Sequence, residues 1–254
     1  VAVLGIGQSM AQSRPTLMNE PLDISPDFRD HANYYFFADS LTSFDPTTGK
    51  GTIKWLRHEA MGGHAFSNTQ FSWRKAPNNE FPSIEYAENP NLPFSIEFVS
   101  PRTVRIKAIT NSTDPQQEAS LMLVKEPTRD NSWKYSFQNG KHVYSNEYGS
   151  VSVAVAPWKI EIRDSEGRLL THTRHQVDGR PSYKPTMPFG FIRRAADYSR
   201  SVNAAFALSP DEKIFGCGES FVNFDKVGQK VVLCTTDANG VESGEMYKPI
   251  PFFM

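Results

Sequence analysis

The residues best suited to do chemistry are four carboxylates near the C-terminal end: Asp225, Asp237, Glu242 and Glu245. Cleavage of a glycosidic bond needs two carboxyl groups that flank the bond. The sequence does not show which of these four groups converge in space. Asp237 stands in a polar turn directly after an apolar run, where its carboxylate either accepts hydrogen bonds from a pair of sugar hydroxyls or closes an Asx turn.

The histidines offer little chemistry by their spacing. His172 and His175 are three residues apart but follow a run of period 2. On a strand this spacing directs them to opposite faces, which argues against a shared metal ion. His58 and His64 flank Met61-Gly62-Gly63, which we interpret as a flexible loop. We therefore expect neither a metal ion nor a cofactor.

Cys217 and Cys234 fall on two expected neighbouring strands. They either form a cross-strand disulfide or remain as two buried free thiols, and we favour the free thiols. No histidine lies near either cysteine in the sequence, so neither is expected to be a nucleophile.

The elements that position these residues follow a period of two. Phe94–Ile109 alternates apolar and polar residues on both sides of Pro101, and Trp133–Tyr144 does so around Gln138-Asn139-Gly140-Lys141. Both segments predict β-hairpins, and Asn-Gly is the strongest short hairpin signal. Only Ser209–Glu212 suggests a short helical turn. Further strands are expected at Val151–Val155, Trp158–Ile162, Arg168–Leu170, Asn203–Leu208, Lys213–Cys217 and Lys230–Cys234.

This map favours an all-β antiparallel sandwich with few short helices. The segments 76–93 and 177–190 are rich in proline and glycine and are expected to be loops within one domain. We expect an N-terminal extension at 13–29 and a single β-sandwich domain at 30–254.

Four short motifs occur in a set order within the last forty residues. They are Phe215–Phe221 (FGCGESF), Phe224–Gln229 (FDKVGQ), Thr236–Ala238 (TDA) and Tyr247–Met254 (YKPIPFFM). This series resembles the end of the N-terminal domain of glycoside hydrolase family 31, which contains α-glucosidases and α-xylosidases. The resemblance covers about residues 30–254 and is specific from Phe206 onward.

The resemblance implies a mutarotase-like β-sandwich, also called a supersandwich, which packs against a downstream (β/α)8 barrel. In the family the barrel carries the nucleophile and the acid/base carboxylate of a retaining mechanism. Nothing in the chain matches the W-x-D-M-N nucleophile strand of that barrel. The chain alone is therefore expected to be inactive. Its expected partners are a catalytic barrel in the same polypeptide and an oligosaccharide substrate.

By motif, the resemblance makes Asp237 a substrate contact, and it makes Asn239, Glu242 and Glu245 members of a loop at the mouth of the pocket. No catalytic residue is expected in this chain. The loop is longer than a minimal glucosidase connection, which slightly favours xylosyl substrates.

Two positions nearby depart from the family pattern. Cys217 stands where Leu is common, and Cys234-Thr235 stands where Trp-Asn is common. Loss of this aromatic residue weakens the similarity in substrate. Glu219 and Lys226 also match family positions, and we interpret them as domain-packing or turn residues.

Both ends of the chain look cut. Val1–Gln12 has an apolar start and small residues before a possible cleavage after Ala11, as in the tail of a secretory signal. The alternative is a short N-terminal strand. The signal predicts export, to the periplasm or cell surface if the source is bacterial. The chain would then be the front part of a larger enzyme.

The net charge of −1 argues against nucleic acid as a partner, and no apolar run is long enough to span a membrane. Two other functions remain open. A free-standing carbohydrate-binding module fits the sandwich and its aromatic residues, although one loop aspartate leaves most of a sugar pocket unbuilt. An aldose 1-epimerase would need a general acid and base such as His142, His172 and Glu161.

Overall fold

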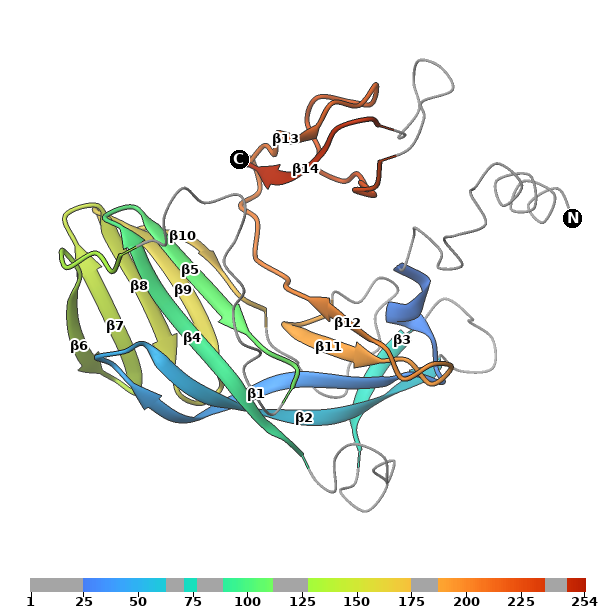
Figure 1. Cartoon of the computed structure of the whole chain (residues 1–254), viewed down its shortest axis with the longest axis horizontal. Coiled ribbons are helices and arrows are strands. Elements are labelled where there is room, and N and C mark those ends of the chain that lie inside the picture. Colours follow the sequence, from blue (N-terminus) through green and yellow to red (C-terminus); the bar gives the residue numbers. More distant parts are fainter. Residues whose placement is uncertain (1–24, 63–70, 77–88, 112–127, 175–186, 236–245) are drawn as a thin grey trace, which may run out of the picture. The chain divides into compact units, whose positions relative to one another are not determined.

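The computed structural model describes residues 25–62, 71–76, 89–111, 128–174, 187–235 and 246–254. These residues form the 3-10 helix η1 (Ser25–Arg29) and fourteen β-strands, β1 to β14 (Figure 1). The all-β class expected from the sequence is confirmed. The chain divides into two compact units, Asp27–Pro210 and the combination of Val1–Pro26 with Asp211–Met254.

The larger unit contains a seven-stranded antiparallel sheet in the order β12-β11-β1-β2-β4-β5, with β3 paired to β2. Its longest members form the hairpin of β1 and β2, which supplies the middle of the sheet. The strand bounds are β1 (Tyr34–Asp45), β2 (Lys50–Gly62), β3 (Phe71–Lys75), β4 (Asn91–Ser100), β5 (Thr103–Ala108), β11 (Gly190–Arg193) and β12 (Arg200–Asn203).

A five-stranded antiparallel sheet follows the order of the chain, as a meander from β6 to β10. Asn139 and Gly140 connect β6 to β7 with φ angles of 50° and 70°, which a type I′ turn requires. The predicted hairpin is thereby confirmed. The strand bounds are β6 (Lys134–Gln138), β7 (Lys141–Asn146), β8 (Gly149–Ala154), β9 (Lys159–Asp164) and β10 (Leu169–His172).

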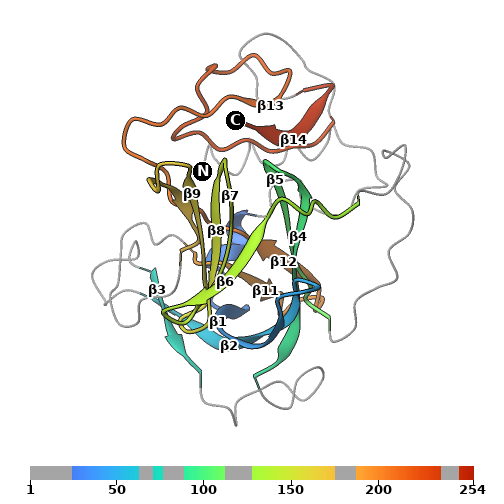
Figure 2. The same cartoon turned by 90° about the vertical axis from the view of Figure 1, so that its left-hand side faces the viewer.

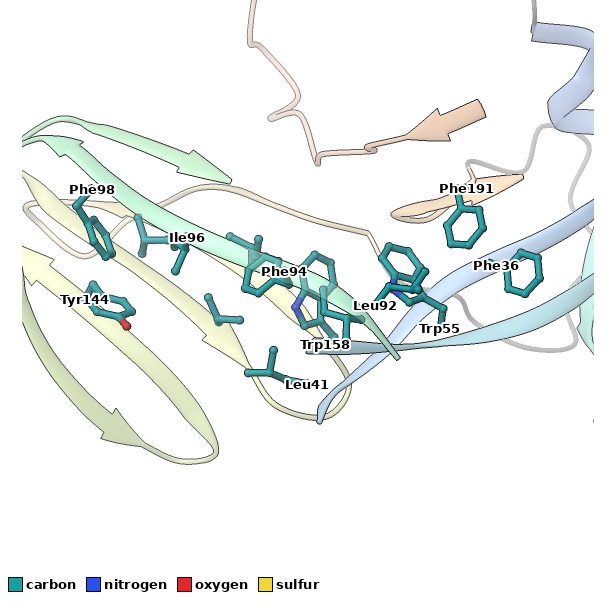
Figure 3. Close-up of a cluster of buried hydrophobic side chains, with 14 residues drawn as sticks. Phe36, Leu41, Trp55, Leu92, Phe94, Ile96, Phe98, Tyr144, Trp158 and Phe191 are labelled. Atoms are coloured by element: carbon teal, nitrogen blue, oxygen red, sulfur yellow. The ribbon is translucent and has the colours of Figure 1, made fainter. Parts of the chain in front are cut away.

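The two sheets of this unit enclose one hydrophobic core. Figure 2 shows them as facing walls, with β4 and β5 opposite the five-stranded sheet. Phe94 and Ile96 of one sheet and Tyr144 of the other belong to the same cluster of fully buried side chains (Figure 3). Trp158, between β8 and β9, lies with its ring edge against Phe94, at 5.7 Å between centroids. This packing defines a β-sandwich.

The strand β1 contacts a core on both of its faces. Phe36 belongs to the main cluster between the sheets, whereas Tyr35 and Phe37 pack with Trp73 and Ile192 in a second cluster. Three consecutive residues of one strand are therefore buried. The apolar pattern of β1 is consequently a continuous run, which a period-2 search does not detect.

The smaller unit holds a two-stranded antiparallel sheet of β13 (Gly216–Gly218) and β14 (Pro249–Phe253). Gly218 has a φ of +96°, and a Cβ atom there would lie 2.1 Å from the carbonyl oxygen of Lys248. A Cβ atom at Gly216 would likewise lie 2.5 Å from the carbonyl oxygen of Phe252. These two glycines therefore let the backbones of β13 and β14 approach closely.

Several local predictions were wrong. Lys230–Cys234 forms no strand, and the amide of Cys234 donates within the segment itself, to the Val232 carbonyl at 3.2 Å. Ser209–Glu212 contains a turn rather than a helix. His58 does not border a loop, because β2 continues to Gly62 and buries this imidazole.

The expected strand Asn203–Leu208 is also shorter than predicted. Only Asn203 belongs to a strand, at the end of β12, and Phe206 forms an isolated bridge with Thr173. A single bridge cannot hold a strand, because each strand needs a continuous row of partners in its neighbour.

Candidate functional site

The expected site residues Asp237, Asn239, Glu242 and Glu245 lie outside the described residues. The structure does describe the two ends of the segment that carries them. Thr235 and Met246 form an isolated parallel bridge, and Met246 is buried. The two ends of this ten-residue segment, 236–245, are therefore joined at the bridge between Thr235 and Met246.

The return limb of this segment continues directly into the two-stranded sheet. The amide of Glu219 donates to the carbonyl of Lys248 at 3.3 Å, and Phe215 and Met254 exchange backbone hydrogen bonds of 2.8 and 2.9 Å. The first and last of the four motifs therefore pair with one another. Their pairing holds the base of the segment 236–245.

Asp225 ties the second motif to the start of the first. Its carboxylate accepts hydrogen bonds from the amides of Val227 at 3.0 Å and Ile214 at 3.3 Å, and from Nζ of Lys213 at 3.1 Å. The Val227 amide, followed by Lys213, lowers the pKa of this carboxyl. Asp225 is therefore an ionised structural acceptor, which is unsuited to act as a general acid. Lys226 donates Nζ to the Asn223 carbonyl at 2.7 Å, within the same turn.

Apolar side chains of this smaller unit are exposed in unusual number. Along β14, Ile250 and Phe252 point to one face and Phe253 to the other, and all three are exposed, Phe253 at 64%. Phe224 is 80% exposed. Other exposed apolar residues of the unit are Phe221, Val227, Leu233, Tyr247 and Met254. A two-stranded sheet with apolar residues on both faces is marginal in water, so such a surface marks an interaction site.

Neither cysteine forms a disulfide. Both thiols are free and half-buried rather than fully buried. Cys217 lies between Gly216 and Gly218 with a φ of 70°, and Sγ of Cys234 lies 3.8 Å from the Thr235 carbonyl oxygen. Among the described residues, no three histidine, cysteine, aspartate or glutamate side chains gather to hold a metal ion.

Among the described residues of the larger unit, the epimerase candidates His142, His172 and Glu161 do not form a working acid–base pair. Glu161 binds Lys141, whose neighbour on β7, His142, points to the opposite face of the sheet. His172 does pair with Glu161 across β9 and β10. Burial raises the pKa of Glu161, but the hydrogen bonds from Lys141 and Lys159 prevail and lower it to about 2. Such a carboxylate is too weak a base to take up a proton near neutral pH.

The fold and the ordered motifs define a carbohydrate-enzyme domain of the mutarotase-like sandwich class. A family model described as the glycosyl hydrolase 31 N-terminal galactose mutarotase-like domain matches residues 93–254. The match covers more than half of the chain, and the chain therefore belongs to this family. The expected family and the mutarotase-like sandwich are both confirmed.

Solved structures with the same fold are several times longer than this chain. The cycloalternan-forming enzyme of Listeria monocytogenes, solved with a pentasaccharide substrate, aligns with a TM-score of 0.54 at 15% identity over 87% of this chain and 16% of its own. A Flavobacterium johnsoniae GH31 dextranase complexed with glucose aligns with a TM-score of 0.50 at 18% identity over 86% of this chain and 21% of its own. The chain thus spans about a sixth to a fifth of these proteins. No curated protein matches the sequence.

The exposed apolar surface of β14 was predictable from the sequence, although the strand does not alternate apolar and polar residues. Ile250-Pro251-Phe252-Phe253 is apolar at every position, so no face of this strand is polar. A strand of that kind is typical of a segment covered on both faces. Within the described part of the chain, no helix is long and apolar enough to cross a membrane.

Proposed function

We propose that the chain is the non-catalytic N-terminal domain of a retaining α-glycoside hydrolase, an α-glucosidase or an α-xylosidase. In this proposal a (β/α)8 barrel later in the same polypeptide carries the nucleophile and the acid/base. The family to which the chain belongs is described by its N-terminal position. The lengths of its structural relatives leave ample room for a further domain.

The observation that carries this proposal is the exposed apolar surface of β14. Ile250, Phe252 and Phe253 place apolar side chains on both faces of a two-stranded sheet. Burial of one such side chain stabilises an interface by about 1.5–3 kcal/mol. The barrel is the proposed covering surface. β14 and the neighbouring Phe221 and Phe224 would then form the junction between the two domains.

The segment 236–245 is proposed to reach the substrate from this junction. Asp237 follows the anchored Thr235 by two residues, and Glu245 precedes the anchored Met246. The two ends meet at this bridge, and Met246 lies three residues before the start of β14, so a barrel docked on β14 would lie close to the base of the segment. We assign Asp237 as a contact to sugar hydroxyls, with Asn239, Glu242 and Glu245 at the mouth of the pocket.

The finer substrate assignment is also proposed. The length of the segment between Asn239 and Tyr247 slightly favours xylosyl over glucosyl substrates, and the replacement of Trp-Asn by Cys234-Thr235 predicts a pocket that is less aromatic at its edge. Export of the protein rests on residues 1–12, which lie outside the described residues.

Hydrolysis of aryl α-glycosides tests the proposal. The polypeptide extended by the roughly 350 residues that a barrel needs should hydrolyse an aryl α-glucoside or α-xyloside with retention, and this 254-residue chain should not. An extended polypeptide without turnover on glucosyl, xylosyl and galactosyl substrates would refute the enzyme assignment. Turnover by this chain alone would refute its non-catalytic role.

A further inference from the structure

A row of aromatic rings lies at the β6 edge of the sandwich, within the larger unit. We call it the aromatic strip, and it consists of Phe44, Tyr135, Phe137 and His142. The His142 ring lies 4.5 Å from Phe44, 4.9 Å from Phe137 and 6.0 Å from Tyr135, measured between centroids. The strip therefore joins the end of β1 to the first two strands of the other sheet.

The strip continues the inner face of the five-stranded sheet beyond the core. Tyr135 pairs with Tyr144 and Phe137 with His142 across β6 and β7, so all four side chains share one face. Tyr144 is fully buried between the sheets, whereas Tyr135 is 42% and Phe137 55% exposed. β6 ends the strand order of its sheet. The rings of Tyr135 and Phe137 therefore lie at the edge of the sheet, where no described residue covers them.

The polar atoms of the strip are neutral. The hydroxyl of Tyr135 and Nδ1 of His142 share a hydrogen bond of 3.0 Å. Burial lowers the pKa of His142, so its imidazole is uncharged at neutral pH. The second ring nitrogen has no hydrogen-bond partner among the described residues. The strip thus offers flat apolar faces together with uncharged hydrogen-bonding groups, and none of its side chains forms an ion pair with another described residue.

We propose that the aromatic strip binds a neutral oligosaccharide, at a site separate from the segment 236–245. The C–H groups of a pyranose ring pack well against the electron-rich face of an aromatic ring, and its hydroxyls pair with neutral donors and acceptors. Tyr135 and Phe137 lie two residues apart on one strand, so their rings sit about 7 Å apart along it. Two such platforms can contact two sugar units of one chain.

The choice of a sugar as the occupant rests on the proposed function. A second copy of the chain fits the edge less well. β6 has only five residues and begins with the charged Lys134, a combination that blunts edge-to-edge pairing of strands. An anionic ligand would find no cation in the strip itself.

Affinity electrophoresis of this chain through gels containing dextran or soluble starch tests the proposal. Wild type should be retarded by at least one of the two, and Phe137→Ala and Tyr135→Leu should weaken binding about tenfold. Tyr135→Phe keeps the ring and should stay within about threefold of wild type. Phe206→Ala removes an exposed aromatic ring of the same unit outside the strip, and it should bind as wild type does. Circular dichroism confirms that each variant is folded.

Four outcomes would overturn the proposal. The first is no retardation of wild type by either neutral polymer, the second is binding by Phe137→Ala and Tyr135→Leu that equals that of Phe206→Ala, and the third is retardation of wild type by acidic polygalacturonate as strong as that by the neutral polymers. A change from dimer to monomer in Phe137→Ala by light scattering, without a change in sugar binding, would assign the strip to a protein interface instead. Hydrolysis by the extended polypeptide is a separate readout. Its absence refutes the proposed function, while strip-dependent binding would stand.

Discussion

Neutralising Glu161 should remove a pH-dependent part of the stability of the sandwich. This side chain lies on the outer face of β9 and is 8% exposed. Its carboxylate lies 2.9 Å from Nζ of both Lys141 and Lys159, and 3.6 Å from Nη2 of Arg163. Burial opposes the charge of Glu161, but the two lysine hydrogen bonds prevail and lower its pKa from 4.5 to about 2.

The lowered pKa fixes the sign and the pH range of the effect. A carboxyl whose pKa is depressed on folding stabilises the folded state above its unfolded pKa, here about 4.5, and loses this contribution as the pH falls towards about 2. The full difference corresponds to about 3 kcal/mol. Because solvent screens the partly exposed cations, we expect about 1–2 kcal/mol.

Urea unfolding from pH 7 to pH 2 measures this effect. Glu161→Gln should be less stable than wild type by about 1–2 kcal/mol at pH 7, and the two should converge as the pH approaches 2. Glu166→Gln removes a carboxylate that is 68% exposed in a turn and should follow wild type throughout. A constant gap between Glu161→Gln and wild type across the whole range would refute this electrostatic reasoning.

Three further substitutions test the packing and the junction. Gly218→Ala places a Cβ atom against the Lys248 carbonyl, so amide hydrogen exchange in β13 and β14 should accelerate at least tenfold. Gly167 also has a positive φ, but a Cβ atom there meets no atom within 4 Å. Gly167→Ala should therefore leave the exchange in β13 and β14 unchanged. Trp158→Ala empties a fully buried site and should cost about 3–5 kcal/mol in urea unfolding, and a loss below 1 kcal/mol would contradict the assigned core. Phe253→Asp should lower the melting temperature of the extended polypeptide while leaving that of this chain nearly unchanged; equal effects on both would argue against a covered β14.

The hairpins of the sandwich were predictable because one face of each strand is buried. Phe94, Ile96 and Phe98 are buried on β4, and the alternation was visible in the sequence. The strands β1 and β2 could not be predicted from such an alternation. Tyr35 and Phe37 pack into a second cluster behind the sheet, so β1 shows no alternation. Tertiary contacts on both faces override the period on which the prediction relies.

The backbone pairings around the candidate site were less predictable than its sequence motifs. The ordered motifs identified the family correctly, but they did not show that Phe215 pairs with Met254 or that Thr235 pairs with Met246. Such pairings join residues far apart in the sequence and depend on backbone approach, for which Gly216 and Gly218 were the only local sign. The role of Asp237 stays a prediction, since this residue lies outside the described residues.

The central claim is that this domain carries a substrate-contacting segment to a catalytic barrel. The kcat/KM of the extended polypeptide on an aryl α-glycoside, with and without Asp237→Ala, tests it most directly. Loss of a hydrogen-bonded carboxylate contact predicts a fall of about 10- to 100-fold, with an unchanged melting temperature. The neighbouring Asn239→Ala, at the proposed mouth of the pocket, should lose less. An Asp237→Ala variant with the kcat/KM of wild type would contradict the account.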